Sequence, residues 1–177
     1  MKFDIKDFKN PHLTSFDEYL SMYEDSIQNP SKFFLDQAKK EIEWFKEPTK
    51  GYCGELTAPT WFEDGKLNIT YNCLDRNVKA TPNKTAIIWQ GDDKDQSKKI
   101  TYKELLSEVS KLANGLKAIG VKKGDRVCIY MPMVPQAAYA MLACLRIGAI
   151  HSVVFGGFSP EAISSRIIDA DCEYVIT

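Results

Sequence analysis

Apolar residues in the second half of the chain predict an alternation of strands and helices. Continuous apolar runs at 126–131 and 149–155 are typical of strands, and a shorter run at 173–177 predicts a third. Between them, 135–147 and 160–170 have the composition and length of helices. Because parallel strands are joined by such crossovers, we expect consecutive βαβ units, with the two middle strands covered on both faces.

A hairpin and a helix are predicted just before this alternation. Short β-type runs at 85–90 and 99–101 flank the charged stretch 91–98, which is typical of a hairpin with a solvated loop. Thr101 and Glu104 have the spacing of a capping box. The helix that follows has one apolar face, formed by Leu105, Val109, Leu112, Leu116 and Ile119. Gly120 is predicted to end it in a left-handed conformation.

The first part of the chain is less regular. Ser15 and Glu18 match a second capping box, so a helix is expected from about residue 16 to 27. The run Asn29-Pro30-Ser31 stops that helix and can cap and begin another, whose inner stripe would be Phe34, Ala38 and Ile42. Aromatic residues separated by Pro and Gly over 46–69 predict an irregular segment laid over a larger body.

These patterns predict an α/β fold with two parts. Residues 1–75 would be a helical and irregular amino-terminal extension, packed on an incomplete, mostly parallel sheet with βαβ crossovers and a preceding hairpin. Residues 76–177 would be the first βαβ part of a larger domain. Since the chain stops immediately after a strand, we expect the sheet to be truncated.

Composition and charge indicate which partners and which cellular compartment to expect. Lys and Arg number 23 against 24 Asp and Glu, so the formal net charge is -1. Such a balance creates no field that attracts nucleic acid or an anionic membrane, and neither is expected as a partner. The five cysteines are odd in number and several lie in apolar runs, which predicts buried, reduced thiols. No leader-type or membrane-spanning apolar segment is found, so we expect a cytoplasmic protein.

The strongest candidate for a binding site is Phe155-Gly156-Gly157, at the predicted carboxyl end of a parallel strand and just before a helix. Ligands of open α/β sheets bind at such strand ends, and a helix amino terminus favours an anion. The alternative is that the glycines only make a turn and that Ser159 only caps a helix. Local sequence leaves both interpretations open.

Other candidates for chemistry are weaker. The run 122–125 contains two lysines but is predicted to be a solvated turn. His12 and His151 have no neighbours at metal-ligand spacing, so no metal site is expected. No nucleophile motif or Walker-type loop is present, and no catalytic residue is assigned.

Four longer phrases carry a resemblance to a known family. They are WFEDGKLNITYNCLDR at 61–76, IWQGDD at 88–93, IYMPM at 129–133 and HSVVFGGFSPE at 151–161. In this order they resemble the amino-terminal signatures of acetyl-CoA synthetases, and the earlier helical segment resembles the family's amino-terminal extension. The resemblance therefore covers nearly the whole chain.

The resemblance implies an AMP-forming ligase that uses ATP, CoA and Mg²⁺ to convert acetate to acetyl-CoA through an acetyl-adenylate. The family's phosphate loop and its second lysine have no counterpart among these residues. We therefore expect this chain alone to be inactive, to bind none of these molecules tightly, and to need the rest of its own chain as a partner. In the family the Phe-Gly-Gly turn contacts CoA, which implies a partial CoA site at Phe155, Gly156 and Gly157.

Three alternatives remain at this point. One is a propionyl-CoA or related short-chain acyl-CoA synthetase, because such enzymes share part of the phrase at 61–76. Another is a non-catalytic module that binds CoA or a nucleotide through the Phe155 turn. The third is a purely structural body in which Gly156 and Gly157 serve only as a turn.

Overall fold

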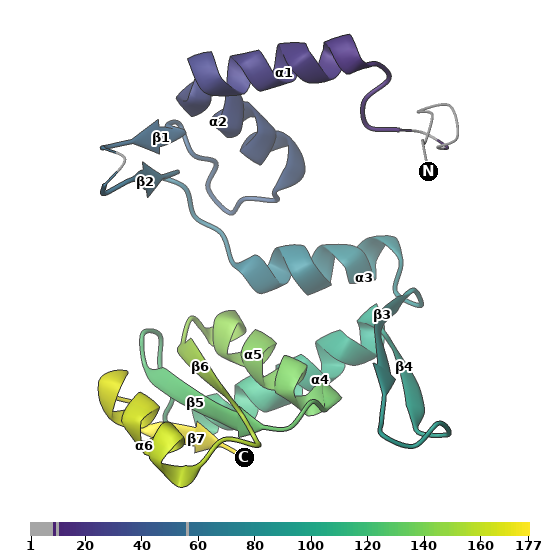
Figure 1. Ribbon diagram of the computed structural model, residues 1–177, viewed down its shortest axis with the longest axis vertical. Helices are drawn as coiled ribbons and strands as arrows, with labels where there is room; N and C mark the ends of the chain where they lie inside the picture. The colour runs from purple at the N-terminus through teal and green to yellow at the C-terminus, as the bar shows by residue number, and fades with distance from the viewer. Residues whose placement is uncertain (1–8, 10, 56) are drawn as a thin grey trace. The chain divides into compact units, whose positions relative to one another are not determined.

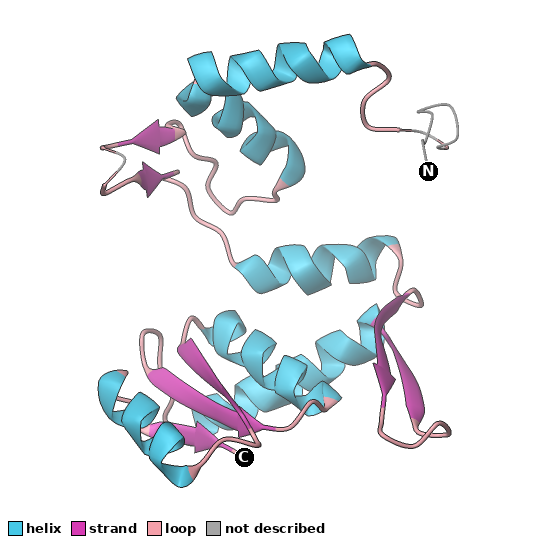
Figure 2. Ribbon diagram, viewed as in Figure 1, coloured by secondary structure: helices cyan, strands magenta, loops and turns pink. Residues whose placement is uncertain are grey.

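The computed structural model describes residue 9, residues 11–55 and residues 57–177. The chain divides into two compact units, Met1–Leu67 and Asn68–Thr177, and each is described by itself. Figure 1 labels the helices and strands, and Figure 2 distinguishes the two kinds of element. Within the described part of the chain, no helix combines the length and apolar character needed to cross a membrane.

The first unit begins with two helices, α1 at Phe16–Gln28 and α2 at Pro30–Glu41. The Ser15 hydroxyl accepts a hydrogen bond from the Glu18 backbone N–H at 3.1 Å, as the capping-box pattern predicts. The Glu18 carboxylate, however, accepts from the backbone N–H and hydroxyl of Thr14, at 2.7 and 2.9 Å. Thr14 is therefore the main partner of the carboxylate, because its amide and hydroxyl offer two donors, and the predicted return bond from the Ser15 N–H is only a minor cause of the lowered pKa of Glu18.

The side-chain cap expected for α2 from Asn29 or Ser31 is not formed, so this prediction is wrong. Asn29 occupies the N-cap position, but its side chain donates to the Asp25 carboxylate at 3.0 Å. The Ser31 hydroxyl instead bonds the backbone of Tyr52. Pro30 alone begins the helix as predicted, since it has no N–H that would lack a partner there.

The segment after α2 contains a small ladder between β1, Tyr52–Cys53, and β2, Thr60–Trp61. The Trp61 ring packs edge-on against Phe34 of α2, with ring centroids 5.3 Å apart, and lies tilted against Tyr52 at 5.1 Å. A second edge-on aromatic pair, Trp44 and Phe62, lies in the same unit. The aromatic side chains of this irregular segment thus pack on one another and on α2.

The second unit starts with a helical segment in which a π-helical stretch, η2 at Tyr71–Asp75, runs directly into α3 at Arg76–Ala80. The predicted hairpin follows as β3, Thr85–Gln90, and β4, Ser97–Thr101, which pair antiparallel. Helix α4 spans Tyr102–Ala118. Both bonds of its capping box are present, so this prediction is confirmed.

The predicted βαβ units are confirmed. Their elements in chain order are β5 at Arg126–Met131, α5 at Pro135–Ile147, β6 at Ile150–Phe155, α6 at Pro160–Asp169 and β7 at Tyr174–Ile176. The three strands are parallel and lie in the order β6-β5-β7. Crossovers between parallel strands are right-handed as a rule, and with the order β6-β5-β7 that rule predicts α5 and α6 on opposite faces of the sheet.

The prediction that both middle strands are covered on both faces holds for β5 and is wrong for β6. Val127, Cys128 and Ile129 of β5 are fully buried. Ile150 and Val153 of β6 are 56% and 49% exposed. The reason is the order of the strands in the sheet. Because β7 pairs with the far side of β5, β6 lies at the sheet edge with one neighbouring strand.

The core of this unit lies where α4 and α5 pack on the sheet. Its fully buried side chains include Leu74, Ile100, Val109, Val127, Ile129 and Ala140. Ile119, predicted to face inward, is 66% exposed because α4 ends at Ala118 and Ile119 lies beyond its last turn. Gly120 has the predicted left-handed conformation, with φ of 102°.

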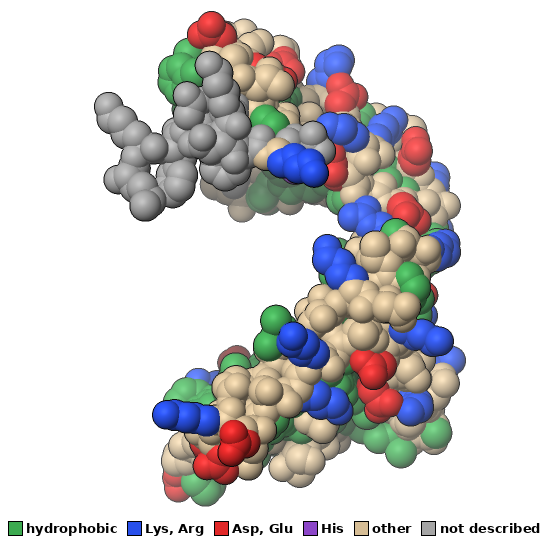
Figure 3. Space-filling view, turned by 90° about the vertical axis from the view of Figure 1, so that its right-hand side faces the viewer, with side chains coloured by type: hydrophobic (Ala, Val, Ile, Leu, Met, Phe, Trp, Pro, Cys, Tyr) green, Lys and Arg blue, Asp and Glu red, His purple; other side chains and the backbone are tan. Residues whose placement is uncertain are grey.

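All five cysteines are free thiols. Cys128 and Cys144 are buried as predicted, whereas Cys53 and Cys172 are half-buried and Cys73 is exposed, which corrects the expectation for these three residues. Basic and acidic side chains are interspersed on the face of the molecule that Figure 3 shows. This distribution agrees with the balanced composition.

Candidate functional site

The Phe155-Gly156-Gly157 segment lies where the sequence placed it, between a parallel strand and a helix. Phe155 is the last residue of β6, and α6 begins at Pro160. The Ser159 hydroxyl accepts from the Ala162 backbone N–H at 3.4 Å and caps α6 as expected. The turn is therefore at the carboxyl end of the sheet, where ligands of open α/β folds bind.

Hydrogen bonds hold this turn to the neighbouring strand. The Phe158 N–H donates to the Phe155 carbonyl at 3.0 Å, and the Gly156 N–H donates to the Met131 carbonyl at 3.1 Å. The hydroxyl oxygen of Tyr130 lies 2.9 Å from the Gly156 carbonyl and 3.1 Å from that of Phe158. Sequence analysis missed Tyr130; the signal was a polar tip near the end of an otherwise apolar strand.

Close packing constrains the two turn glycines to different degrees. A Cβ at Gly156 would lie 3.1 Å from the backbone nitrogen of Pro132. A Cβ at Gly157 would lie 2.7 Å from the ring of Phe155. A side chain at Gly156 would press on backbone, whereas one at Gly157 would displace only the half-exposed ring of Phe155, so packing favours a small residue mainly at Gly156.

The turn exposes aromatic surface beside one cation. Phe155 and Phe158 are 50% and 48% exposed, with their rings edge-on and 6.1 Å between centroids. The guanidinium carbon of Arg166 lies 5.2 Å from the ring centroid of Phe158. An amphipathic ligand could therefore stack on the rings and place an anionic group near Arg166.

The amino terminus of α6 already has an internal carboxylate. The pKa of Glu161 is lowered, first by the hydrogen bond from its own backbone N–H and then by that from the Ser159 hydroxyl. Both donors belong to the residues that begin α6. An external anion would have to share this position with Glu161.

His151 and the run 122–125 are other polar candidates that the sequence offers. His151 lies in β6, and burial lowers its pKa, which favours the neutral ring. The run 122–125 forms the predicted turn, in which the Asp125 carboxylate accepts from the Lys122 N–H at 2.8 Å. Among the residues that the structure describes, no group of three or more His, Cys, Asp or Glu side chains could hold a metal ion.

Two family models together match most of the chain. The model described as "AMP-binding enzyme" matches residues 74–177, and the model described as "Acetyl-coenzyme A synthetase N-terminus" matches residues 19–73. The chain therefore belongs to the AMP-binding enzyme family. The resemblance identified from the four sequence phrases is confirmed.

Within this family the chain is similar to proteins named acetyl-coenzyme A synthetase. It is 55% identical to one from Gamma-proteobacterium EBAC31A08, over 97% of this chain and 27% of that protein. It is 56% identical to one from Rhizobium meliloti (strain 1021), over 96% of this chain and 26% of the relative. Acetyl-coenzyme A synthetase 2 from Pseudomonas aeruginosa is 53% identical, over 91% of this chain and 25% of that protein. The chain spans about a quarter of the length of these relatives.

Proposed function

We propose that this chain is the amino-terminal portion of an acetyl-CoA synthetase, an acetate–CoA ligase of the AMP-forming type. The observation that carries the proposal is the identity of about 55% to acetyl-coenzyme A synthetases along nearly the whole chain. The separate match of residues 19–73 to the acetyl-coenzyme A synthetase N-terminus supports the acetate enzyme in particular.

The two parts of the chain have different roles in this proposal. We assign residues 1–75 to the family's amino-terminal extension and residues 76–177 to the first βαβ part of the large domain. The compact units divide after Leu67, and the two family matches divide after Cys73. Both divisions lie close to the proposed boundary.

The proposed reaction has two steps, and neither changes an oxidation state. A carboxylate oxygen of acetate attacks the α-phosphorus of ATP, and the bond to pyrophosphate breaks, which gives acetyl-adenylate. The thiol of CoA then attacks the acetyl carbon, its proton is lost, and AMP leaves. We assign no catalytic residue and no Mg²⁺ contact to this chain; its proposed contribution is to bind part of CoA.

The proposed CoA contact is the turn formed by Phe155, Gly156 and Gly157. Its position at the carboxyl end of the sheet, its exposed Phe155 ring and the cation of Arg166 support this assignment.

The first experiment measures acetate-dependent release of pyrophosphate from Mg-ATP. It compares this 177-residue chain with the product of any longer natural reading frame that contains it. Activity is expected only in the longer product, because no catalytic residue is assigned here. Activity of the short chain would contradict the proposal, and faster turnover of propionate than acetate would favour the propionyl-CoA alternative.

A substitution in the longer product tests the CoA contact. Phe155→Ala is sharper than a glycine substitution, because alanine at Gly156 would press on the Pro132 backbone. Loss of one stacked ring is expected to raise the KM for CoA about tenfold and to leave pyrophosphate release in the absence of CoA unchanged. Ile119→Ala, at another exposed apolar residue, is the control. An unchanged KM for CoA in Phe155→Ala would favour the purely structural interpretation of the turn.

A further inference from the structure

A hollow in the second unit, Asn68–Thr177, contains a cluster of cationic side chains. It is a groove of about 650 Å³ between α4, the end of α5 and the turn that precedes β5. Four of its lining residues are cationic, namely Lys117, Lys122, Lys123 and Arg146. None of its described lining residues is Asp or Glu. We call it the basic groove, defined by these four residues.

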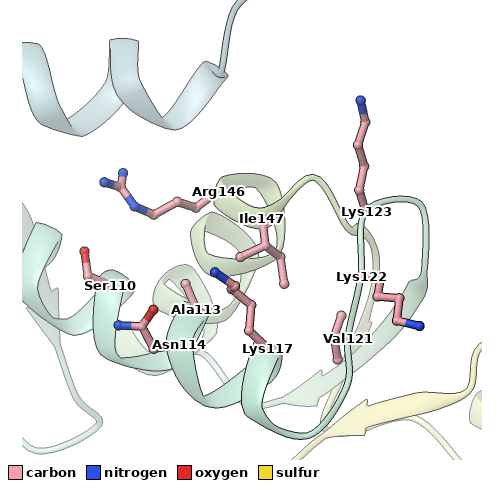
Figure 4. Close-up of a pocket in the computed structure, with 9 residues that line it drawn as sticks. All are labelled: Ser110, Ala113, Asn114, Lys117, Val121, Lys122, Lys123, Arg146 and Ile147. Carbon is pink, nitrogen blue, oxygen red and sulfur yellow. The ribbon is translucent and has the colours of Figure 1, made fainter.

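The cationic side chains approach the groove from three segments. In Figure 4, Lys117 rises from α4 toward the side on which Arg146 of α5 lies, and Ser110 and Asn114 of α4 are on that side as well. Lys122 and Lys123 extend from the turn at the other end of the groove (Figure 4). Lys117 therefore turns toward the side that carries a hydroxyl and an amide, whereas Lys122 and Lys123 extend outward from the turn and flank the other end of the groove (Figure 4).

The free charge in the groove comes from its lysines. Arg146 is neutralised by Asp75, whose carboxylate oxygens lie 2.8 and 3.0 Å from its guanidinium nitrogens. Lys117, Lys122 and Lys123 form no ion pair with any residue that the structure describes. Three lysines that form no described ion pair thus gather here, and the acidic group in their turn is Asp125, whose carboxylate accepts from the Lys122 backbone N–H at 2.8 Å.

Helix capping does not account for these lysines. Both α4 and α5 end beside the groove, and cations are favourable at helix carboxyl termini. The carbonyls at these ends, however, already accept other donors. The Val121 N–H donates to the Leu116 carbonyl, and the Ala149 N–H donates to that of Cys144. The ammonium groups are therefore not needed as caps and can face a ligand.

The basic groove is separate from the proposed CoA contact. The turn that contains Lys122 and Lys123 precedes β5, whereas the Phe155 turn follows β6. Strands β5 and β6 are parallel with Met131 opposite Phe155, so the two places lie at opposite ends of the same strands. Strands of this length span roughly 20 Å. A ligand in the groove would not touch the Phe155 turn.

We propose that the basic groove binds a small oligophosphate-bearing anion. Its volume is in the range of small-molecule sites rather than of extended peptide grooves. Lysine ammonium groups bind phosphate as point charges, and the hydroxyl of Ser110 and amide of Asn114 can donate to phosphate oxygens. This site is independent of the proposed acetyl-CoA synthetase function.

Inorganic tripolyphosphate is the probe, because it carries the proposed charge without any base or acyl group. Isothermal titration of the full chain is expected to show saturable binding that weakens as salt rises. The triple variant Lys117→Gln, Lys122→Gln, Lys123→Gln is expected to bind about tenfold more weakly or worse. The matched control Lys94→Gln, Lys99→Gln, Lys103→Gln removes the same charge from exposed lysines that do not line the groove and is expected to bind like the unaltered chain.

Amide chemical shifts locate the binding independently of heat. Shifts in the segments 110–123 and 146–148 on addition of tripolyphosphate support the proposal, provided that the triple variant loses them. Equal weakening in both triple variants would mean that only net charge matters and would overturn it. Absence of binding, or shifts confined to the Phe155 turn, would overturn it as well.

Discussion

Arg146 and Asp75 form a two-pronged ion pair that joins the end of α5 to the last residue of the π-helical stretch η2. Their side chains are only 30% and 20% exposed, so the pair is partly shielded from water. Hydrogen bonding to Asp75 raises the pKa of Arg146. The pair lies 71 residues apart in sequence and fixes the start of this unit against its central crossover helix.

The first prediction concerns this pair. Asp75→Asn keeps the shape of the side chain and removes its charge, which leaves Arg146 partly buried without a counter-charge. The free energy of unfolding in urea is expected to fall by about 2 kcal/mol. Glu108→Gln breaks the exposed ion pair with Lys111 and should change the free energy of unfolding by less than about 0.5 kcal/mol. Equal effects of the two substitutions would show that shielding is unimportant here.

The second prediction concerns the capping box of α4. The pKa of Glu104 is lowered by hydrogen bonds from the Thr101 backbone N–H and then from its hydroxyl. A lowered folded-state pKa means that the folded chain binds fewer protons than the unfolded chain in this range. The stability from this group is therefore complete above the ordinary pKa of glutamate and is lost as pH falls through the lowered value.

The substitution Glu104→Gln tests this sign directly. Urea unfolding of the natural chain and of this variant, from neutral to acidic pH, should show the advantage of the natural carboxylate shrinking on acidification. Glu63→Gln, at a carboxyl outside the capping boxes, provides the comparison. If the difference in stability between the natural chain and the Glu104→Gln variant grew on acidification, the hydrogen bonds assigned from Thr101 to Glu104 would be contradicted.

The third prediction uses two glycines with opposite roles. Gly115 lies inside α4, and apart from its chain neighbours and the nearby backbone of the helix no described heavy atom lies within 4 Å of where its Cβ would be. Gly115→Ala is expected to stabilise the fold by about 0.5–1 kcal/mol. Gly148 ends α5 with φ of 77°, and Gly148→Ala should destabilise the fold by about 1–2 kcal/mol. Thermal unfolding of the two variants should shift in opposite directions; a shift in the same direction would refute the assignment.

The fourth prediction concerns thiol reactivity. Burial raises the pKa of Cys144 to about 11, and burial is also the main cause of the raised pKa of Cys128. At neutral pH both should remain protonated and unreactive, while the exposed Cys73 is alkylated first. Peptide mass spectrometry after a short iodoacetamide pulse measures the order. In urea all should react, and rapid labelling of Cys144 in the folded chain would count against its burial.

Much of the second unit was predictable because its local signals agree with one another. The box of Thr101 and Glu104 begins a helix with a clear apolar face, and Gly120 follows its end in the predicted left-handed conformation. Strand positions followed from apolar runs flanked by polar turns. The position of the Phe155 turn at a strand end followed from this alternation alone.

What local sequence could not predict depends on contacts between distant segments. The exposure of β6 follows from the place that β7 takes beside β5, which no local pattern encodes. Tyr130 supports the Phe155 turn across 26 and 28 residues of sequence. The basic groove escaped notice for the same reason, since Lys117, Lys122 and Arg146 come from three segments that meet only in the folded unit.

The side chain of Asn68 has a consequence for local opening of the fold. Its amide donates to the carbonyls of Leu145 and Arg146, at 3.4 and 3.0 Å. The last turn of a helix ordinarily frays, and its amides then exchange with solvent without global unfolding. Here the carbonyls of that turn are held by a residue that precedes them by 77 and 78 positions. The end of α5 can therefore open only when that distant contact breaks, so its amide exchange is linked to separation of the segment that begins at Asn68 from the crossover helix.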